Sequence, residues 1–208
     1  MLLVIETATA ACSVALLDGG TIVAEAHEEV GRGHAERLLP MIAALSGGGR
    51  ADAILVGCGP GSFTGVRVGV AAARGLALGW SVPVTGYPTL ALVAAAAFVR
   101  PDAPLSLAIT MLGGHGQLFV QRFAGSPLRP LDDLASLTPE DAARVLTDPL
   151  LIGSGAAAVV AIRGWGEAQA ALPRAAHASL LPDPLAALPP SPIYGRAPDA
   201  RPNLQPTA

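Results

Sequence analysis

A glycine-rich turn between an apolar run and a long helical pattern is the place in this sequence where a phosphate could bind. It reads CGPGSFTG, from Cys58 to Gly65. Free backbone N–H groups and the helix dipole favour anions at such a turn. A phosphate loop, however, needs a Gly-Lys-Ser/Thr sequence, and all 13 of the Lys+Arg positions of this chain are arginine. The lack of lysine excludes a phosphate-loop lysine and also Schiff-base chemistry.

A dinucleotide-binding loop is the second alternative for this turn. Such a loop needs G-x-G-x-x-G, followed about 20 residues later by an acid for the ribose. Neither the register from Gly57 nor that from Gly59 ends in glycine, and no Asp or Glu occurs between Asp52 and Asp102. We therefore predict no nucleotide site and expect a structural turn, with glycines at positive φ, a proline that fixes the turn and a hydroxyl that caps the helix. These structural loop residues are Gly59, Pro60, Gly61, Ser62 and Thr64.

Side chains for metal binding or acid–base catalysis are scarce elsewhere in the chain. The histidines and cysteines show no spacing typical of metal ligands or of a redox pair. They are His27, His34, His115, His177, Cys12 and Cys58. We expect both cysteines to be small buried residues of a reduced protein, and we predict no catalytic residue, no metal and no cofactor.

The composition predicts a globular chain with a large core. The 208 residues are 51% hydrophobic and only 14% charged, with a mean hydropathy of +0.50. A formal charge of −3 gives no basic field for sequence-independent nucleic-acid binding. The N-terminus lacks the basic region of a signal peptide. Charged residues and prolines interrupt the apolar stretch 66–99, so no span of about 20 residues remains for a membrane helix, and we expect a cytoplasmic protein.

Three short apolar runs near the N-terminus predict a β-meander. They are LLVIET, CSVALLDGG and TIVAEAHEEV, and DGG is a hairpin signal. An amphipathic helix follows, because apolar residues from Leu38 to Leu45 have the i, i+3, i+4, i+7 spacing. A buried strand, ADAILVGCG, then leads into the glycine-rich turn and a helix that ends near Trp80. After Pro101 strands and helices alternate again on a smaller scale, which indicates two related subdomains.

The long helix after the turn contains an unusual number of glycines. One strip consists of Gly65, Gly69 and Ala73, and an adjacent strip of Ala72, Gly75 and Gly79. A glycine inside a helix costs about 0.5–1 kcal/mol relative to alanine. Small residues at this spacing are useful where another backbone packs closely. That backbone could belong to this chain or to a second one.

These segments resemble the TsaB (YeaZ) family, the dimerisation subunit of the bacterial machinery that makes tRNA threonylcarbamoyladenosine. The resemblance is carried by LLVIETATAACSVALLDGG, by GRGHAERLLPMIAAL and, most specifically, by the GPGSFTG-x-R-x-G block. It covers roughly residues 1–100 well. It implies an α/β, actin-like (ASKHA, ribonuclease H-like) fold of two related subdomains. We expect these at 1–100 and 101–195, followed by a disordered tail at 196–208.

The resemblance also implies a non-catalytic role. Members of the family pair with the catalytic paralogue TsaD, which TsaE joins as an ATPase, and the complex transfers a threonylcarbamoyl group to the adenosine beside the anticodon. The family contact with TsaD is a bundle built from two early helices, and tRNA is reached only through the complex. Carried onto this chain, the expected interface residues are His34, Glu36, Leu38, Met41, Ile42, Leu45, Gly65, Arg67, Val68, Gly69, Ala72, Ala73, Gly75 and Leu76.

The chain departs from the catalytic pattern at three places. The paralogue holds a metal with H-x-x-x-H, but here His34 is followed four residues later by Leu38. Glu6 stands where the family usually has Asp. The turn at Leu112–Phe119 lacks the acid and the arginine that are common there. These departures argue against ATP hydrolysis.

Several alternatives stay open at this point. The chain could be a metal-independent glycoprotease-like or ATP-binding enzyme of the actin-like superfamily, or it could form a homodimer when TsaD is absent. Arg67 and Arg74 share a helix face, which is either a solvated edge or a contact with partner acids or RNA. The run GSGAAA at Gly153–Ala158 is either an adenosine-binding turn or a simple strand-to-helix connection.

Overall fold

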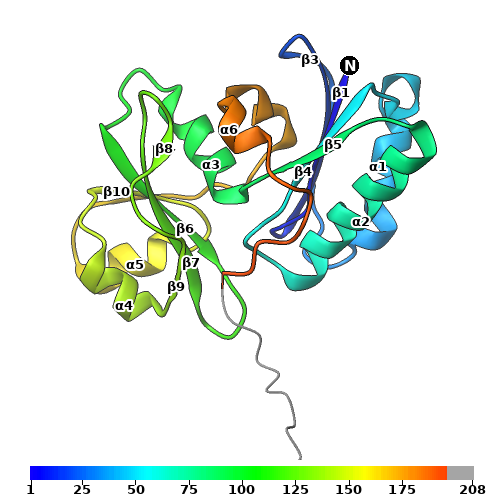
Figure 1. Cartoon of the computed structure of the whole chain (residues 1–208). Helices are drawn as coiled ribbons and strands as arrows, with labels where there is room; N and C mark the ends of the chain where they lie inside the picture. The colour runs from blue at the N-terminus through cyan, green and yellow to red at the C-terminus, as the bar shows by residue number, and fades with distance from the viewer. Residues whose placement is uncertain (196–208) are drawn as a thin grey trace, which may run out of the picture.

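Two β-sheets with helices on their faces make up the chain (Figure 1). The computed structural model describes residues 1–195. The first sheet has the order β3-β2-β1-β4-β5. Its strands are β1 (Leu2–Glu6), β2 (Ala11–Asp18), β3 (Thr21–Glu29), β4 (Ala53–Gly57) and β5 (Val84–Tyr87). The predicted meander β1–β3 is confirmed as antiparallel, while β4 and β5 extend the sheet in parallel.

Helices cover both faces of this first sheet, which together with them forms the first lobe. On one face lie α1 (His34–Ala44) and α2 (Phe63–Trp80), which pack on Leu3 and Ile5 of β1. On the other face, Val4 shares a hydrophobic cluster with α3 (Thr89–Phe98), and the 3₁₀ helix η2 (Ala175–Leu180) contacts β1, β2 and β3. The period-2 alternation of a strand sends successive side chains to opposite faces. The residues of β1 before Glu6 are all apolar because both faces of the strand are covered.

The second lobe is built on a six-stranded sheet with the order β11-β10-β6-β7-β8, in which β9 also pairs with β7. Its strands are β6 (Ser106–Leu112), β7 (Leu118–Ala124), β8 (Arg129–Pro130), β9 (Ala135–Leu137), β10 (Leu150–Ile152) and β11 (Glu167–Gln169). Helices α4 (Pro139–Val145) and α5 (Ala156–Arg163) cover one face. Thr138 caps α4 by accepting a hydrogen bond from Asp141 N.

Helix α3 lies between the two sheets (Figure 1). The same hydrophobic cluster contains Val4 of the first sheet, Leu90 of α3 and Ile109 of the second sheet. Almost every residue of α3 is buried, which explains why its sequence, TLALVAAAAF, is apolar on all sides. The helix therefore belongs to the core of both lobes.

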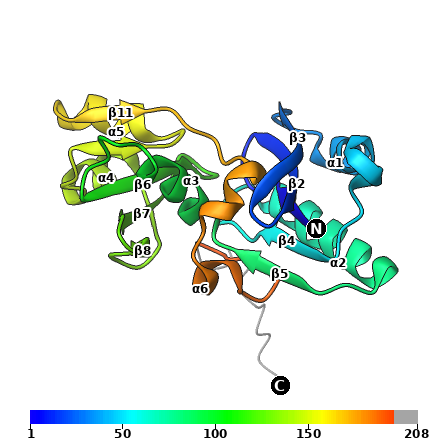
Figure 2. The same ribbon diagram turned by 90° about the horizontal axis from the view of Figure 1, so that it is seen from above.

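The end of the described chain returns to the first lobe (Figure 2). The 3₁₀ helix η2 (Ala175–Leu180) packs on the first sheet, and α6 (Asp183–Ala186) packs on β5. A second short 3₁₀ helix, η1 (Ser46–Gly49), follows α1. The expected boundary at residues 100 and 101 lies in the connection between α3 and β6. Within the expected second subdomain, η2 and α6 contact strands of the first sheet. The predicted tail at 196–208 lies outside the described residues.

Candidate functional site

The glycine-rich turn packs on the turn between β1 and β2. Ser62 is the N-cap of α2, because its side chain accepts a hydrogen bond from Gly65 N at 3.2 Å. Gly59 has the expected positive φ of 87°, but the expectation was wrong for Gly61, which has no positive φ. Gly61 is required for another reason: a Cβ there would overlap the carbonyl of Ala8. The turn is therefore fixed by an internal contact.

The first small-residue strip of α2 faces the chain itself. Gly65 and Gly69 are buried, and a Cβ at either position would overlap Thr7 at the end of β1. Thr7 Oγ1 donates a hydrogen bond to Gly65 O at 2.7 Å. The close backbone that this strip accommodates is thus an internal one.

The large apolar residues of helix α1, Leu38, Met41 and Ile42, likewise face the core of the chain. His34 is buried, and its Nε2 lies 2.9 Å from Thr9 O, so it ties α1 to the β1–β2 turn. Several residues of the expected interface with TsaD are buried in the core of this chain, and a buried residue has no surface with which a partner could make contact. Those enclosed residues are His34, Leu38, Met41, Ile42, Leu45, Gly65, Gly69 and Ala73. Those that keep exposed surface are Glu36, Arg67, Val68, Ala72, Gly75 and Leu76.

The second strip of α2 remains open. A Cβ at Gly75 or Gly79 would meet no atom of another element within 4 Å among the described residues. Leu39 of the neighbouring helix α1 is also exposed. We group eight small or apolar residues of these two neighbouring helices that keep exposed surface under the name α1–α2 face. It consists of Ala35, Leu39, Ala43, Val68, Ala72, Gly75, Leu76 and Gly79.

A charged pair borders α1 on the side away from α2. Arg37 donates to both carboxylate oxygens of Glu28 on β3, at 3.0 and 2.6 Å. This hydrogen bonding lowers the pKa of Glu28. The pair is exposed, so it orients α1 on the sheet but contributes little free energy.

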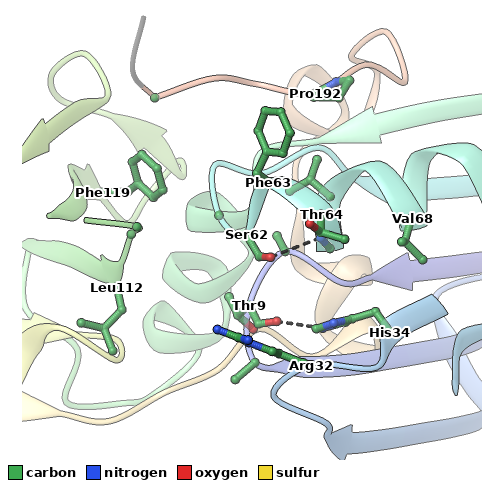
Figure 3. A pocket seen from close by; sticks show the side chains of 18 of the residues that line it. Thr9, Arg32, His34, Ser62, Phe63, Thr64, Val68, Leu112, Phe119 and Pro192 are labelled. Atoms are coloured by element: carbon green, nitrogen blue, oxygen red, sulfur yellow. Dashed lines mark hydrogen bonds between the residues drawn. The ribbon is translucent and has the colours of Figure 1, made fainter. Parts of the chain in front are cut away.

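A cleft of about 1010 Å³ separates the two lobes. Its walls come from the β1–β2 turn, the loop before α1, the glycine-rich turn, the β6–β7 hairpin and the segment after α6. Figure 3 shows Phe63 and Phe119 on opposite sides of the opening, with Thr9, Arg32 and His34 on the side of the first lobe. The turn at Leu112–Phe119, to which the sequence assigned no role, forms the wall of the second lobe.

Arg67 belongs to an aromatic cluster at the rim of this cleft. Its guanidinium carbon lies 3.1 Å from the centroid of the Phe63 ring, and its Nη2 donates to Tyr194 Oη at 3.0 Å. Arg74, seven residues further along, is exposed outside the cleft. The sequence missed this cluster because Tyr194 approaches α2 only through the fold.

Glu6 is a buried carboxylate beneath the cleft. It is fully buried and accepts hydrogen bonds from Ala8 N at 2.7 Å and from Thr89 Oγ1 at 3.0 Å. Burial raises its pKa, and these hydrogen bonds offset part of that rise. Within residues 1–195, no group of three or more His, Cys, Asp or Glu could hold a metal ion. No helix in the same range is long and apolar enough to span a bilayer.

Comparison with known proteins places these features in a family. Residues 22–171 match the family TsaD, described as tRNA N6-adenosine threonylcarbamoyltransferase. The chain is 46% identical over 113 residues to the tRNA threonylcarbamoyladenosine biosynthesis protein TsaB of Escherichia coli, covering 51% of this chain and 48% of that protein. It is 49% identical over 102 residues to the TsaB of Haemophilus influenzae, covering 47% and 43%. The matched part thus spans about half the length of these relatives.

Solved structures extend the likeness to the whole fold. YeaZ from Pseudomonas aeruginosa superposes with a TM-score of 0.71 at 31% identity, covering 86% of this chain and 89% of that one. A second structure, an uncharacterized protein with similarity to peptidase YEAZ from Pseudomonas aeruginosa, gives 0.76 at 31% identity and covers 94% and 99%. The predicted α/β fold class is confirmed, and the chain shares the fold of these YeaZ structures.

Proposed function

The chain belongs to the TsaB/YeaZ family, and on that premise we propose that it is an accessory subunit of tRNA threonylcarbamoyladenosine biosynthesis. In this role it binds the threonylcarbamoyltransferase TsaD and activates it, without catalysing the transfer itself. TsaE joins the same complex, tRNA is engaged through the complex, and the site of action is the cytoplasm. The α1–α2 face is the observation that carries the proposal.

The α1–α2 face has the properties of a helix-bundle contact. Its small residues let a second pair of helices approach closely, and its apolar atoms favour removal from water. The open glycines Gly75 and Gly79 have no use inside the chain, since no other described element approaches them. They cost helix stability and are explained by a partner that packs there.

A related fold suits this face well. The TsaD family matches 22–171 of this chain, and the threonylcarbamoyltransferase of Corynebacterium diphtheriae is 34% identical over 127 residues. A paralogue with equivalent helices could pack its own pair on α1 and α2 about a pseudo-two-fold axis, much as the two halves of an isologous dimer do. Glu36 and Arg67, which keep exposed surface on the two helices, would select the partner more than strengthen the contact.

Reconstitution tests this proposal. The purified chain is combined with TsaD, TsaE, ATP, the threonylcarbamoyl adenylate and tRNA, and the reaction is repeated without it. We expect the chain to co-purify with TsaD and its omission to abolish modification. A chain that neither binds TsaD nor changes its activity would overturn the assignment.

The same face could also pair two copies of this chain. Self-association would use identical apolar residues, so TsaD should compete with it. Sedimentation velocity at several concentrations, with and without TsaD, separates the two. If TsaD converts the homodimer into a heterodimer, both partners use the α1–α2 face. If the homodimer persists when TsaD binds, self-association and TsaD binding use different surfaces.

A further inference from the structure

Two histidines lie together where the chain returns from the second lobe to the first. His27 is on β3, and His177 is on η2, which contacts β1, β2 and β3. A charge on the His27 ring lowers the pKa of His177, so the two rings are close to each other. Neither ring lines the cleft between the lobes, and the proposed function uses neither of them.

Helix η2 is part of the core that joins the two lobes. Its residues Ala175, Ala176 and Ala178 are buried in the same hydrophobic cluster as α3. Ala175 N donates a buried hydrogen bond to Ser13 Oγ of β2 at 3.0 Å. The contact between η2 and the first sheet therefore keeps an apolar face of that sheet away from water.

Charges of both signs surround the two rings. Nη2 of Arg174, the residue before η2, lies 3.7 Å from Oε1 of Glu25 on β3. Burial lowers the pKa of both rings, Arg174 lowers it further, and Glu25 opposes part of this effect. Glu29 on β3 also acts on His27 and raises its pKa. Within residues 1–195, the other elements that pack on η2, which are α3, β1 and β2, add no charged group to this set.

Protonation of the rings opposes the docked position of η2. A neutral imidazole has one ring nitrogen that is only an acceptor, whereas both nitrogens of the cation are donors. His27 Nδ1 is buried and has no hydrogen-bond partner among residues 1–195, so a proton on it would have no acceptor. A positive charge on either ring would also face Arg174. Both rings therefore favour the neutral form while η2 is docked.

We propose that His27 and His177 form an acid-sensitive latch, in which protonation of the two rings releases residues 174–180 from the first sheet. Docking lowers both pKa values below the ordinary 6.5, so the docked state binds protons less tightly than the released state. The contribution of the rings to docking is thus fully present above pH 6.5 and is lost as the pH falls through the lowered values. Release would uncover apolar residues of the first sheet that share a cluster with η2, which are Val4, Ala15 and Leu17.

Hydrogen exchange followed by mass spectrometry tests the latch in the full chain. Exchange of a peptide that covers 174–180 is measured at about pH 7.5 and about pH 5.5 and corrected for the intrinsic effect of pH on exchange. A peptide from β6 (Ser106–Leu112) in the second lobe is the reference. We expect the opening constant of 174–180 to rise about 10-fold or more in acid relative to the reference, the effect of lowering one linked pKa by about one. An equal change in both peptides, or none, would overturn the inference.

Removal of the two rings should remove this response to pH. In the double variant His27→Gln with His177→Gln, the opening constant of 174–180 should be the same at both pH values. His115→Asn is the matched control, because it also removes an imidazole but lies on the β6–β7 hairpin. Asparagine tolerates the positive φ of 62° at that position. The control should respond as wild type does, and a double variant that still opens in acid assigns the response to other groups and overturns the latch.

The ion pair beside the rings separates an electrostatic effect from loss of packing. Glu25→Gln removes an acid that raises both pKa values, so it should increase the ratio of the opening constants in acid and at neutral pH. Arg174→Gln removes a cation that lowers both, so it should decrease that ratio. If the pair acted only as a bridge between β3 and η2, both variants would change the ratio in the same direction, and that result contradicts the latch.

Proton NMR of the wild-type chain decides the question if the double variant does not fold. The ring protons of His27 and His177 are assigned with the single variants and titrated. Both should titrate below pH 6.5, and titration of either ring at or above this value would overturn the inference. Each of these measurements uses the chain alone, so the latch can fail or hold independently of the proposed binding to TsaD.

Discussion

Thr7, the residue after β1, lies so close to Gly69 of α2 that a Cβ on the glycine would overlap the threonine hydroxyl. Thr7 also donates to Gly65 O one turn earlier in α2. The helix is thus held against the end of β1 through two positions that lack side chains. Because of this contact, the strip with Gly65 and Gly69 faces the core, whereas the strip with Gly75 and Gly79 stays open.

Alanine at Gly69 should destabilise the fold, and alanine at Gly75 should stabilise it. The Gly69→Ala methyl would displace Thr7, at a cost of about 1–3 kcal/mol for overpacking. The Gly75→Ala methyl enters open space and improves helix propensity by about 0.5–1 kcal/mol. Urea denaturation of both variants measures the difference. If both variants change the free energy of unfolding equally, then Gly69 does not face the core while Gly75 faces open space.

An arginine at Gly75 should abolish binding to TsaD without unfolding the chain. The long side chain would stand on the α1–α2 face, where the partner's helices must approach. Ala158→Arg is the matched control, because Ala158 is exposed on α5 of the second lobe. Pull-down and circular dichroism report binding and folding separately. If Gly75→Arg binds TsaD as tightly as Ala158→Arg does, the contact lies elsewhere.

Replacement of Ser62 should cost more stability than replacement of Thr64. Ser62 Oγ accepts from Gly65 N at the start of α2, and loss of an N-cap typically costs about 0.5–2 kcal/mol. Thr64 is exposed, so Thr64→Ala should change the free energy of unfolding by well under that amount. Thermal unfolding of Ser62→Ala and Thr64→Ala tests the ranking. The reverse order would show that Thr64 is the cap.

The buried Glu6 should make stability depend on pH. Burial raises its pKa in the folded chain above the ordinary value of 4.5, so the folded state holds the proton more tightly than the unfolded state. Its contribution is fully present below pH 4.5 and is lost as pH rises through the raised pKa. Glu6→Gln removes this titration. The difference in free energy of unfolding, variant minus wild type, should therefore increase from pH 4.5 upward, and a flat difference would contradict the direction.

Local periodicity was sufficient to predict much of the first lobe from the sequence. The three apolar runs of β1–β3 and the apolar spacing of α1 depend on residues close together in the chain. The uniformly apolar sequence of α3 indicates burial on all sides, although it does not say against what. Such features depend on the spacing of residues that are neighbours in the sequence, so they can be predicted from the sequence alone.

Features set by tertiary contacts could not be predicted in the same way. The two strips of α2 have similar composition and spacing, and only the position of Thr7 decides that Gly69 faces inward while Gly75 stays open. For this reason the expected interface included residues that the core encloses. The cluster of Phe63, Arg67 and Tyr194 depends on the return of 187–195 to the first lobe, and no local pattern indicates that return.

The position of α3 has a consequence for how the molecule is assembled. Its side chains complete the cores of both sheets, so a cut in the loop that follows it, near residue 102, would strip one sheet of its cover whichever fragment retained the helix. We therefore expect that neither half folds alone. The chain should melt in a single step, and fragments expressed separately should remain unfolded until mixed.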